Sequence, residues 1–375
     1  MRIERQIYRN AQWENIDNGI KSEDIDLVTV FGNTDELEDK HHYAYLKKQY
    51  PNASIIGCSS SGNILDNSVS ENSIVATAVS FDSANVVLHS VKVDANDDVS
   101  EKTKELADKF DKEGLKHIFV LADGLHINGS KIVKTFNQSV EISKSGGLAG
   151  DGDRFKKTLV ISDDNGEEKI IAALGFYGDA LTINSGYSAG WSEFGARRTI
   201  TKSVENVLYE IDGEPALDFY KKYLGEYAAE LPNSGLRFPL GIKENDNEPE
   251  VIRTLLGIDE EKKTITFAGD IPEGYKARLM KADVVSLIEG ASEAAKIVNN
   301  DNKKDALCLV VSCVGRKIVM NQLIDDELEA VSNILGENVV LAGFYSYGEI
   351  SPHGSDILNC SLHNQTMTLT LIYEN

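Results

Sequence analysis

Polar and aromatic side chains suited to binding a small molecule follow apolar runs in the C-terminal part of the chain. They are Cys313, Arg316, Tyr345, Tyr347, Gly348, Glu349, His363 and Asn364. Ligands of open α/β sheets collect at the carboxyl ends of the strands, so residues that follow strand-like runs are the first candidates. The guanidinium of Arg316 would hold a carboxylate bidentately, and Glu349 would pair with an ammonium. This pattern predicts a site for an amino acid or a similar small metabolite, with Tyr345 or Tyr347 along its apolar part.

A purely structural interpretation of these residues stays open. Gly343 and Gly348 would then be turn formers, Arg316 and Glu349 an ordinary ion pair, and His363 a hydrogen-bonded core residue. We take ligand binding as the prediction, because Glu349 supplies a charge at a position that is neutral in a related segment of the chain.

Catalytic motifs are weak. The segment Gly57-Cys58-Ser59-Ser60-Ser61-Gly62 resembles a nucleophile elbow, but its glycines stand one residue too far apart. The run 146–152 lacks the ending of a P-loop and the spacing of a dinucleotide fingerprint. A Cys313–His363 pair would supply a nucleophile and a base, without a third residue to orient them. We therefore expect no enzyme and no metal site, and keep the Cys313/His363 enzyme as the second alternative.

Strand-like and helix-like segments alternate along the chain. This predicts an α/β fold of two related mixed-sheet halves with helices packed on the sheets. Helices are expected at 35–50, 100–112, 129–143, 215–223, 283–299 and 325–335, and buried strands at 26–31, 53–57, 117–122, 306–313 and 339–343. Residues 158–162 and 169–177 are expected to form a hairpin, 232–250 a connector, and 358–373 a long antiparallel strand.

One pattern occurs twice. Residues 55–64 and 341–350 both read as an apolar strand, a glycine, four residues, a second glycine, then Asn63 or Glu349, then isoleucine. The pattern indicates an internal duplication, in which the second copy has the charged site.

Composition and charge exclude several classes of protein. The chain has 375 residues, of which 41% are hydrophobic and 26% charged, and a formal charge of −22. Such a charge repels nucleic acid and anionic lipid. No apolar run reaches the length that spans a bilayer, and the chain does not begin like a secretory signal, so we expect a cytoplasmic protein without membrane insertion. The four cysteines are expected to be buried free thiols.

Seven segments, in order, resemble the FIST family, a bacterial and archaeal family of sensory proteins with amino- and carboxy-terminal parts. They are Ile56–Ser59, Ala122–Leu125, Gly146–Asp151, Val204–Ala216, Ser312–Arg316, Gly343–Ile350 and Leu362–Thr366. The resemblance implies an extension at 1–24, an amino-terminal domain at 25–220 and a carboxy-terminal domain at 221–375.

The resemblance also implies a signal-input role. Family members are proposed to bind small ligands, amino acids among them, and to act on a separate histidine kinase or cyclic-dinucleotide enzyme. Some stand-alone members bind heme and sense nitric oxide, which is the first alternative here. His363, His126, His353 and the cysteines are available as axial ligands, and no covalent attachment motif selects one of them.

Overall fold

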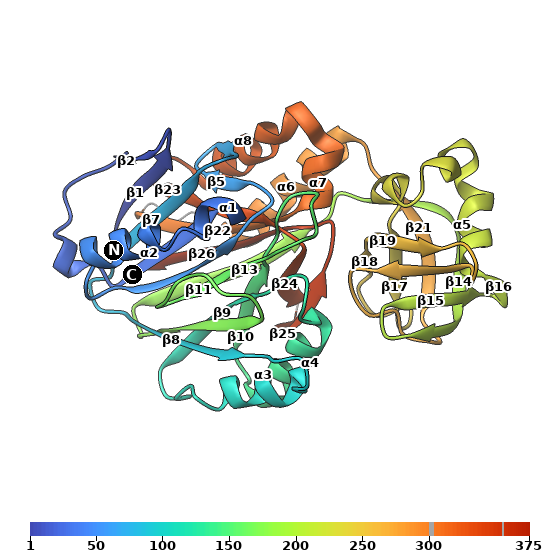
Figure 1. The fold of residues 1–375 in the computed structure, drawn as a ribbon, viewed down its shortest axis with the longest axis horizontal. Helices are drawn as coiled ribbons and strands as arrows, with labels where there is room; N and C mark the ends of the chain where they lie inside the picture. Colours follow the sequence, from blue (N-terminus) through green and yellow to red (C-terminus); the bar gives the residue numbers. More distant parts are fainter. Residues whose placement is uncertain (300–303, 355) are drawn as a thin grey trace.

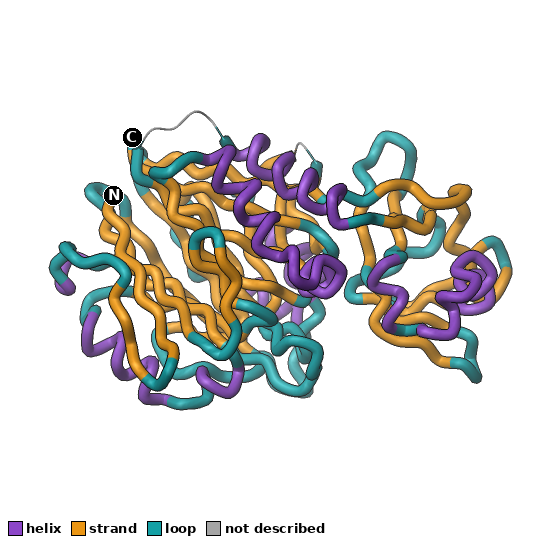
Figure 2. The backbone as a smooth tube through the Cα atoms, turned by 90° about the horizontal axis from the view of Figure 1, so that it is seen from above, coloured by secondary structure: helices purple, strands orange, loops and turns teal. Residues whose placement is uncertain are grey.

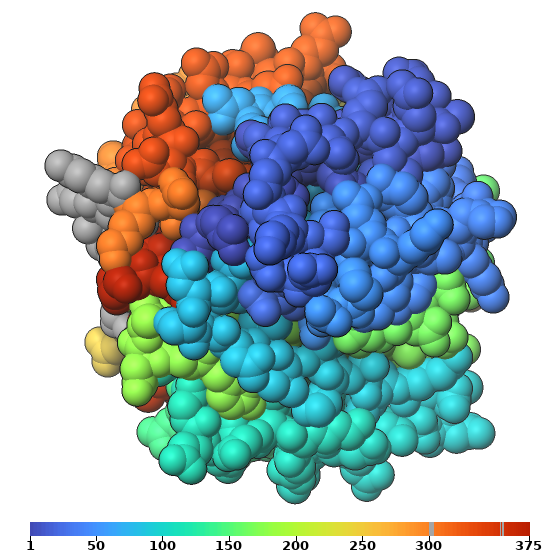
Figure 3. Space-filling view, turned by 90° about the vertical axis from the view of Figure 1, so that its left-hand side faces the viewer, coloured from blue at the N-terminus to red at the C-terminus, as the bar shows by residue number. Residues whose placement is uncertain are grey.

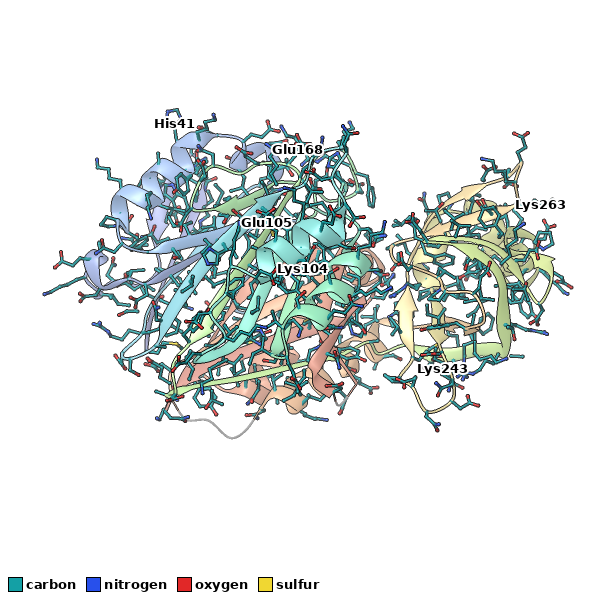
Figure 4. The ribbon with its side chains drawn as sticks, turned by 90° about the horizontal axis from the view of Figure 1, so that it is seen from below. His41, Lys104, Glu105, Glu168, Lys243 and Lys263 are labelled. Atoms are coloured by element: carbon teal, nitrogen blue, oxygen red, sulfur yellow. The ribbon has the colours of Figure 1, made fainter. Side chains whose placement is uncertain are left out.

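The computed structural model describes residues 1–299, 304–354 and 356–375. Figure 1 shows a larger body beside a smaller lobe. The lobe is a continuous insertion that runs from β14 (Ser192–Val204) to β21 (Lys276–Lys281). Figure 4 shows the same division, with Lys243 and Lys263 on the lobe and His41, Lys104 and Glu105 on the larger body.

Within the described residues, the larger body contains three six-stranded sheets of one plan. In each sheet a central strand pairs parallel with one neighbour and antiparallel with the other. The first sheet has the order β11 (Val160–Ser162), β4 (Ser54–Ser59), β3 (Leu27–Gly32), β7 (Ile74–Ser80), β1 (Arg2–Arg9), β2 (Gln12–Asn15). The second has β25 (Asp356–His363), β24 (Gly348–His353), β10 (Ser143–Leu148), β9 (Leu115–Ala122), β12 (Ile170–Tyr177), β8 (Asn85–Lys92). The third has β13 (Leu181–Ser188), β26 (Met367–Glu374), β22 (Ala306–Cys313), β23 (Val339–Ser346), β5 (Asn63–Leu65), β6 (Ser68–Ser70).

Helices cover the outer faces of these sheets. They are α1 (Thr34–Leu37), α2 (Lys40–Gln49), α3 (Val99–Ala107), α4 (Gly129–Ser139), α6 (Val284–Val298), α7 (Val314–Met320) and α8 (Ile324–Leu335). The side chains of Asp98, Asn128 and Asp283 cap α3, α4 and α6, because their oxygens accept backbone N–H groups that lack helical partners. Figure 2 shows helices lying across one face of the strands, where α6 packs on β13, β26 and α8. No helix in the described ranges is long and apolar enough to cross a membrane.

The three sheets exchange strands in a cycle. The strand that follows the parallel pair joins the next sheet: β5 joins β23, β24 joins β10, and β11 joins β4. Backbone hydrogen bonds close the cycle, from Ser61 N–H to the Tyr345 carbonyl (2.8 Å), Tyr347 N–H to the Leu148 carbonyl (3.1 Å), and Gly150 N–H to the Ser59 carbonyl (3.0 Å). The larger body therefore has a pseudo-threefold arrangement. Figure 3 views it from the end away from the lobe, where blue, teal-to-green and orange-to-red sectors meet.

One glycine recurs in each sheet because the neighbouring backbone comes very close. A Cβ atom at Gly57, Gly146 or Gly343 would lie 2.0, 1.8 and 1.8 Å from the carbonyl oxygen of Val30, Val120 and Val310 respectively. Each glycine is the parallel partner of that valine. The expected α/β class is confirmed, and the segments 55–64 and 341–350 occupy equivalent places. Gly146 occupies the third equivalent place, so the structural repeat has three copies.

The lobe has its own apolar core, formed by α5 (Ala216–Leu224) against a mostly antiparallel sheet. Its other elements are β15 (Val207–Ile211), β16 (Glu214–Pro215), η2 (Gly225–Glu230), η3 (Asn233–Arg237), β17 (Leu240–Lys243), β18 (Val251–Arg253), β19 (Leu255–Asp259) and β20 (Thr264–Phe267). Arg253 fixes the lobe to the larger body, since its guanidinium donates to the Leu362 carbonyl at 2.8 Å. Burial lowers the pKa of Arg253 to about 10.

Several local expectations were wrong. The helix expected at 35–50 is two helices, α1 and α2, and the helix expected at 129–143 ends at Ser139. Residues 158–162 and 169–177 form no hairpin, because β11 and β12 lie in different sheets. The segment 358–373 is divided between β25 and β26 for the same reason, and the connector at 232–250 holds η3 and β17.

The predicted domain boundaries do not coincide with the spatial division. The boundary between 220 and 221 falls inside α5, and the N-terminal residues pair as β1 with β7. The part of the chain that stands apart is the lobe, because strands of the C-terminal segment complete sheets that the N-terminal segment begins.

Candidate ligand-binding site

A cleft of about 800 Å³ lies between the larger body and the lobe. We call it the lobe cleft. The larger body contributes the loop after β9, the first residues of α7 and Tyr347; the lobe contributes η3 and the strands around Thr254 and Phe267. Its wall includes Leu125, His126, Ile127, Asp153, Phe155, Glu230, Leu236, Arg237, Thr254, Leu256, Cys313, Val314, Ile318, Val319 and Tyr347. The parallel strands β9 and β22 end at this cleft, which agrees with the expected place for ligands in α/β sheets.

The lobe cleft combines an apolar wall with charges that lack partners. No hydrogen bond or ion pair among the described residues involves the side chain of Arg237, Asp153 or Glu230, and all three are exposed. Mostly apolar cavities with a few polar groups are typical of small-molecule sites, in which the polar groups orient the ligand.

A second hollow of about 700 Å³ shares Asp153, Val314 and Ile318 with the lobe cleft and is lined mainly by polar side chains. Its two cations already have carboxylate partners: Arg154 contacts Asp35 at 2.9 Å, and Lys317 contacts Glu71. The lobe cleft is therefore the better candidate for a charged ligand.

His126 is oriented at the wall of the lobe cleft by a buried carboxylate. Its Nδ1 lies 2.9 Å from Asp123 Oδ2, and no described contact involves its Nε2. Burial alone would raise the pKa of Asp123. The hydroxyl of Thr158 and the N–H groups of Lys169 and Leu125 donate to the carboxylate and hold its pKa below the usual value. Asp123 is consequently ionised near neutral pH and fixes the imidazole ring.

Two of the predicted site residues, Tyr347 and Cys313, line the lobe cleft. The Tyr347 hydroxyl donates to Asp151 and to the Gly152 carbonyl, so the ring is held from its far end. The Cys313 thiol accepts the N–H of Gly315 at 3.4 Å. Burial raises the pKa of Cys313, so the sulfur stays protonated.

Arg316 does not line the lobe cleft, where the predicted role in holding a ligand carboxylate would place it. It also forms no ion pair with Glu349, so the structural alternative is wrong in its partner. It is fully buried, and its guanidinium contacts Glu327 at 2.7 Å and the carbonyls of Ala189 and Leu287 at 2.7 and 2.8 Å. The Tyr345 hydroxyl also donates to Glu327, at 2.5 Å. Arg316 and Tyr345 therefore belong to a buried polar network behind α7.

Glu349 is fully buried next to the cleft wall. Its carboxylate accepts the Ser346 hydroxyl at 2.6 Å, and the Thr366 N–H and hydroxyl at 3.1 and 2.9 Å. Burial raises the pKa of Glu349 to about 7, although these donors and Arg316 act in the opposite direction. The equivalent residue in the segment 55–64 is Asn63, the first residue of β5, which accepts the Ser60 hydroxyl in the same way.

Gly348, His363 and Asn364 also lie outside the cleft lining. A Cβ at Gly348 would touch Leu148 and Leu362, and the His363 ring packs on Tyr187 with centroids 4.0 Å apart. The Asn364 amide oxygen accepts the Thr254 N–H from the lobe at 3.5 Å. Asn364 therefore joins the larger body to the lobe, whereas Gly348 and His363 pack within the larger body.

The sequence interpretation predicted no ligand-binding residue on the lobe side of the cleft. Arg237 and Leu236 lie in the segment 232–250, which was expected to be a connector. Leu256 and Phe267 lie in β19 and β20, where no site residue was predicted. Seven lining residues belong to segments that carry the family resemblance, and of these only Asn206 lies in the lobe: Gly124, Leu125, Leu148, Asn206, Cys313, Val314 and Tyr347. No pattern in the chain indicates that the lobe folds back over the ends of β9 and β22.

The fold is of the α/β class with a candidate binding cleft, and sequence comparison places the chain in a family. The FIST N domain matches residues 26–214 and the FIST C domain matches residues 216–352. The chain belongs to the FIST family, whose domains are sensory and bind small ligands.

Individual relatives give little further information about the function of this chain. An uncharacterized protein of Methanocaldococcus jannaschii, MJ1623, is 25% identical over 392 residues, which cover 93% of this chain and 73% of the relative. Among solved structures, a cyanuric acid hydrolase from A. caulinodans aligns with a TM-score of 0.36 and 7% identity, over 94% of this chain and 90% of its own. A chorismatase aligns with a TM-score of 0.34 and 8% identity, over 99% and 98%. Likeness this weak carries no argument about function.

Proposed function

We propose that the lobe cleft binds an amino acid or a similar small carboxylate, and that the protein passes this signal to a separate histidine kinase or cyclic-dinucleotide enzyme. The observation that carries the proposal is Arg237, a cation without a partner in a cleft that also holds unpaired Asp153 and Glu230. Arg237 would take the role first assigned to Arg316 and hold the ligand carboxylate bidentately. Asp153 or Glu230 would pair with the ammonium, and the side chain of the ligand would lie against Leu236 and Leu256.

Signalling would follow from the position of the cleft. One wall belongs to the lobe and the other to the larger body, so a ligand that contacts both favours one placement of the lobe over others. The turn at 362–366 joins the two parts, since Leu362 and Asn364 contact the lobe while Thr366 contacts Glu349. A partner protein that recognises the lobe placement would then detect occupancy.

Calorimetric titration with an amino-acid panel, each member matched by its decarboxylated amine, tests the proposal. A charge-assisted bidentate contact contributes about 1.5–3 kcal/mol, so Arg237→Ala should weaken binding by about 10- to 150-fold. Lys262→Ala is the control, because Lys262 is an exposed lobe cation whose partner is Asp259, outside the cleft. Binding of no panel member, or equal affinities in the two variants, would refute the proposal.

A second candidate ligand is heme, and His126 supports it. Metal-binding histidines commonly have their other ring nitrogen held by a carboxylate, as Asp123 holds His126 Nδ1 here. The cleft has room for a flat cofactor, and Arg237 would suit a propionate. His126 would hold the iron, which supplies a position for a diatomic gas. His363 and Cys313 fit less well, since His363 does not line the cleft and the Cys313 thiol stays protonated. The side chain of His353 lies outside what the structure describes.

Heme addition followed by visible spectroscopy distinguishes this candidate. A Soret band that is lost in His126→Ala and kept in His89→Ala would support it, since His89 lies on β8, away from the cleft. The absence of a band in the native chain would rule it out.

The proposal is of a binding protein, with no catalytic role for Cys313. It is supported by the burial of the thiol, which raises its pKa, whereas a nucleophilic cysteine needs a lowered one. A thiol-directed probe that modifies Cys313 rapidly at neutral pH would contradict this part of the proposal.

A further inference from the structure

Phe155 has an unusual backbone conformation at the wall of the lobe cleft. Its φ is +49°, in the left-handed region that bulky residues rarely adopt, and the residue is 50% exposed. Glycine would occupy this position without strain. A large apolar ring that is kept in a strained, exposed position indicates a role other than packing in the core.

The loop around Phe155 is held rigidly. The Asp151 carboxylate accepts the N–H groups of Phe155, Lys156 and Lys157 at 3.0, 2.8 and 2.9 Å. The hydroxyl of Tyr347 donates to the same carboxylate. These contacts fix both the backbone that carries Phe155 and the ring on which it rests.

The two rings form a stack with one open side. The centroids of Phe155 and Tyr347 lie 4.7 Å apart with an interplanar angle of 10°. Tyr347 covers one face of the Phe155 ring, and the large exposed fraction of Phe155 leaves the other face accessible. Both residues line the lobe cleft, so the accessible face is available to its ligand.

We infer that the ligand of the lobe cleft carries a flat, unsaturated ring, which stacks on Phe155. This rests on the proposed function and narrows it to ring-bearing carboxylates: either an aromatic amino acid or a heteroaromatic carboxylate without an ammonium. Aromatic rings attract each other in offset-stacked geometry beyond the effect of buried area. Fixing the platform before binding reduces the ordering cost that the ligand would otherwise meet.

The test compares flat and puckered rings of similar size on the full-length chain. Phenylalanine and cyclohexylalanine share the carboxylate, the ammonium and the carbon skeleton, and picolinate lacks the separate ammonium. The variants are Phe155→Leu, which keeps an apolar side chain, and Phe155→Gly, which relieves the left-handed strain. Tyr227→Leu is the control, because Tyr227 is an exposed aromatic residue that does not line the cleft.

The native chain and Tyr227→Leu should bind phenylalanine or picolinate at least about fivefold more tightly than cyclohexylalanine, in keeping with an aromatic pair. Phe155→Leu should lose this preference and keep its affinity for cyclohexylalanine. Phe155→Gly should lose it too, with a melting temperature no lower than that of Phe155→Leu. Equal affinities for flat and puckered rings in the native chain, or an unchanged preference in Phe155→Leu, would overturn the inference alone. Binding of none of these probes while another member of the amino-acid panel binds would also overturn the inference alone. Binding of no panel member at all would overturn it together with the proposed function.

Discussion

Replacing Glu349 by glutamine should remove a pH-dependent loss of stability. The side chain is fully buried, and the Ser346 hydroxyl and the Thr366 N–H and hydroxyl donate to it. A glutamine amide has the same shape: its oxygen would accept from Thr366, and its NH₂ group would donate to the Ser346 oxygen. The variant thus keeps the hydrogen bonds and loses only the ionisation.

The pKa of Glu349 determines the sign and the size of the effect. It is raised in the folded state from 4.5 to about 7 by burial. As the pH rises from 4.5, the unfolded chain releases this proton while the folded chain keeps it, so the native protein loses stability until about pH 7. At about 1.4 kcal/mol per pH unit, the interval corresponds to about 3 kcal/mol. Between pH 4.5 and pH 8, the unfolding free energy of Glu349→Gln should therefore rise by up to about 3 kcal/mol relative to that of the native protein.

Asn63 provides the reciprocal variant, because it occupies the equivalent position and accepts the Ser60 hydroxyl. Its amide also donates to the Ser73 carbonyl at 2.9 Å. Asn63→Asp should create a buried carboxyl group that is tolerated when protonated and costly when ionised, so this variant should lose stability as the pH rises.

Urea unfolding from pH 4.5 to 8.5 at constant ionic strength measures both effects. The difference in unfolding free energy between Glu349→Gln and the native chain should widen with pH, and that between Asn63→Asp and the native chain should become more negative. A Glu349→Gln difference that stays constant within about 0.5 kcal/mol across this range would refute the reasoning.

Two further substitutions test the packing of the larger body. Gly343→Ala would place a Cβ 1.8 Å from the Val310 carbonyl oxygen and should lower the unfolding free energy, measured with urea, by more than about 3 kcal/mol. Gly257→Ala is the control, because its Cβ would have nothing within 4 Å, and it should change this free energy by under about 1 kcal/mol. Similar values for both variants would contradict the close approach of β22 and β23. Glu327→Ala would leave the Arg316 guanidinium buried without its carboxylate and should cost about 3–5 kcal/mol in the same assay. A loss below about 1 kcal/mol would mean that this buried pair does not hold α7 in place.

The sequence by itself determined the strands in which a run of apolar side chains indicates burial on both faces. β3, β9, β22 and β23 are mainly apolar runs, because both faces of each are buried. The first three were predicted within two residues at each end, and the end of β23 was expected three residues too early. β10 was missed since its sequence, SKSGGL, has low strand propensity. Its Gly146 is required by contact with the Val120 carbonyl, and such a requirement exists only after the two strands have paired.

The candidate site depended still more on tertiary structure. Residue types alone indicated that Arg316 and Glu349 carry opposite charges near strand ends, but the turn of α7 into α8 places Glu327 against Arg316. Tyr347 and Cys313, two of the residues predicted to bind a ligand, line the lobe cleft because Tyr347 directly follows β23 and Cys313 ends β22. Arg237 and Phe155 were not, because their relevance comes from the lobe closing over the larger body and from one strained backbone angle. Local periodicity determines which segments form strands and helices, whereas long-range pairing decides which side chains share a cavity.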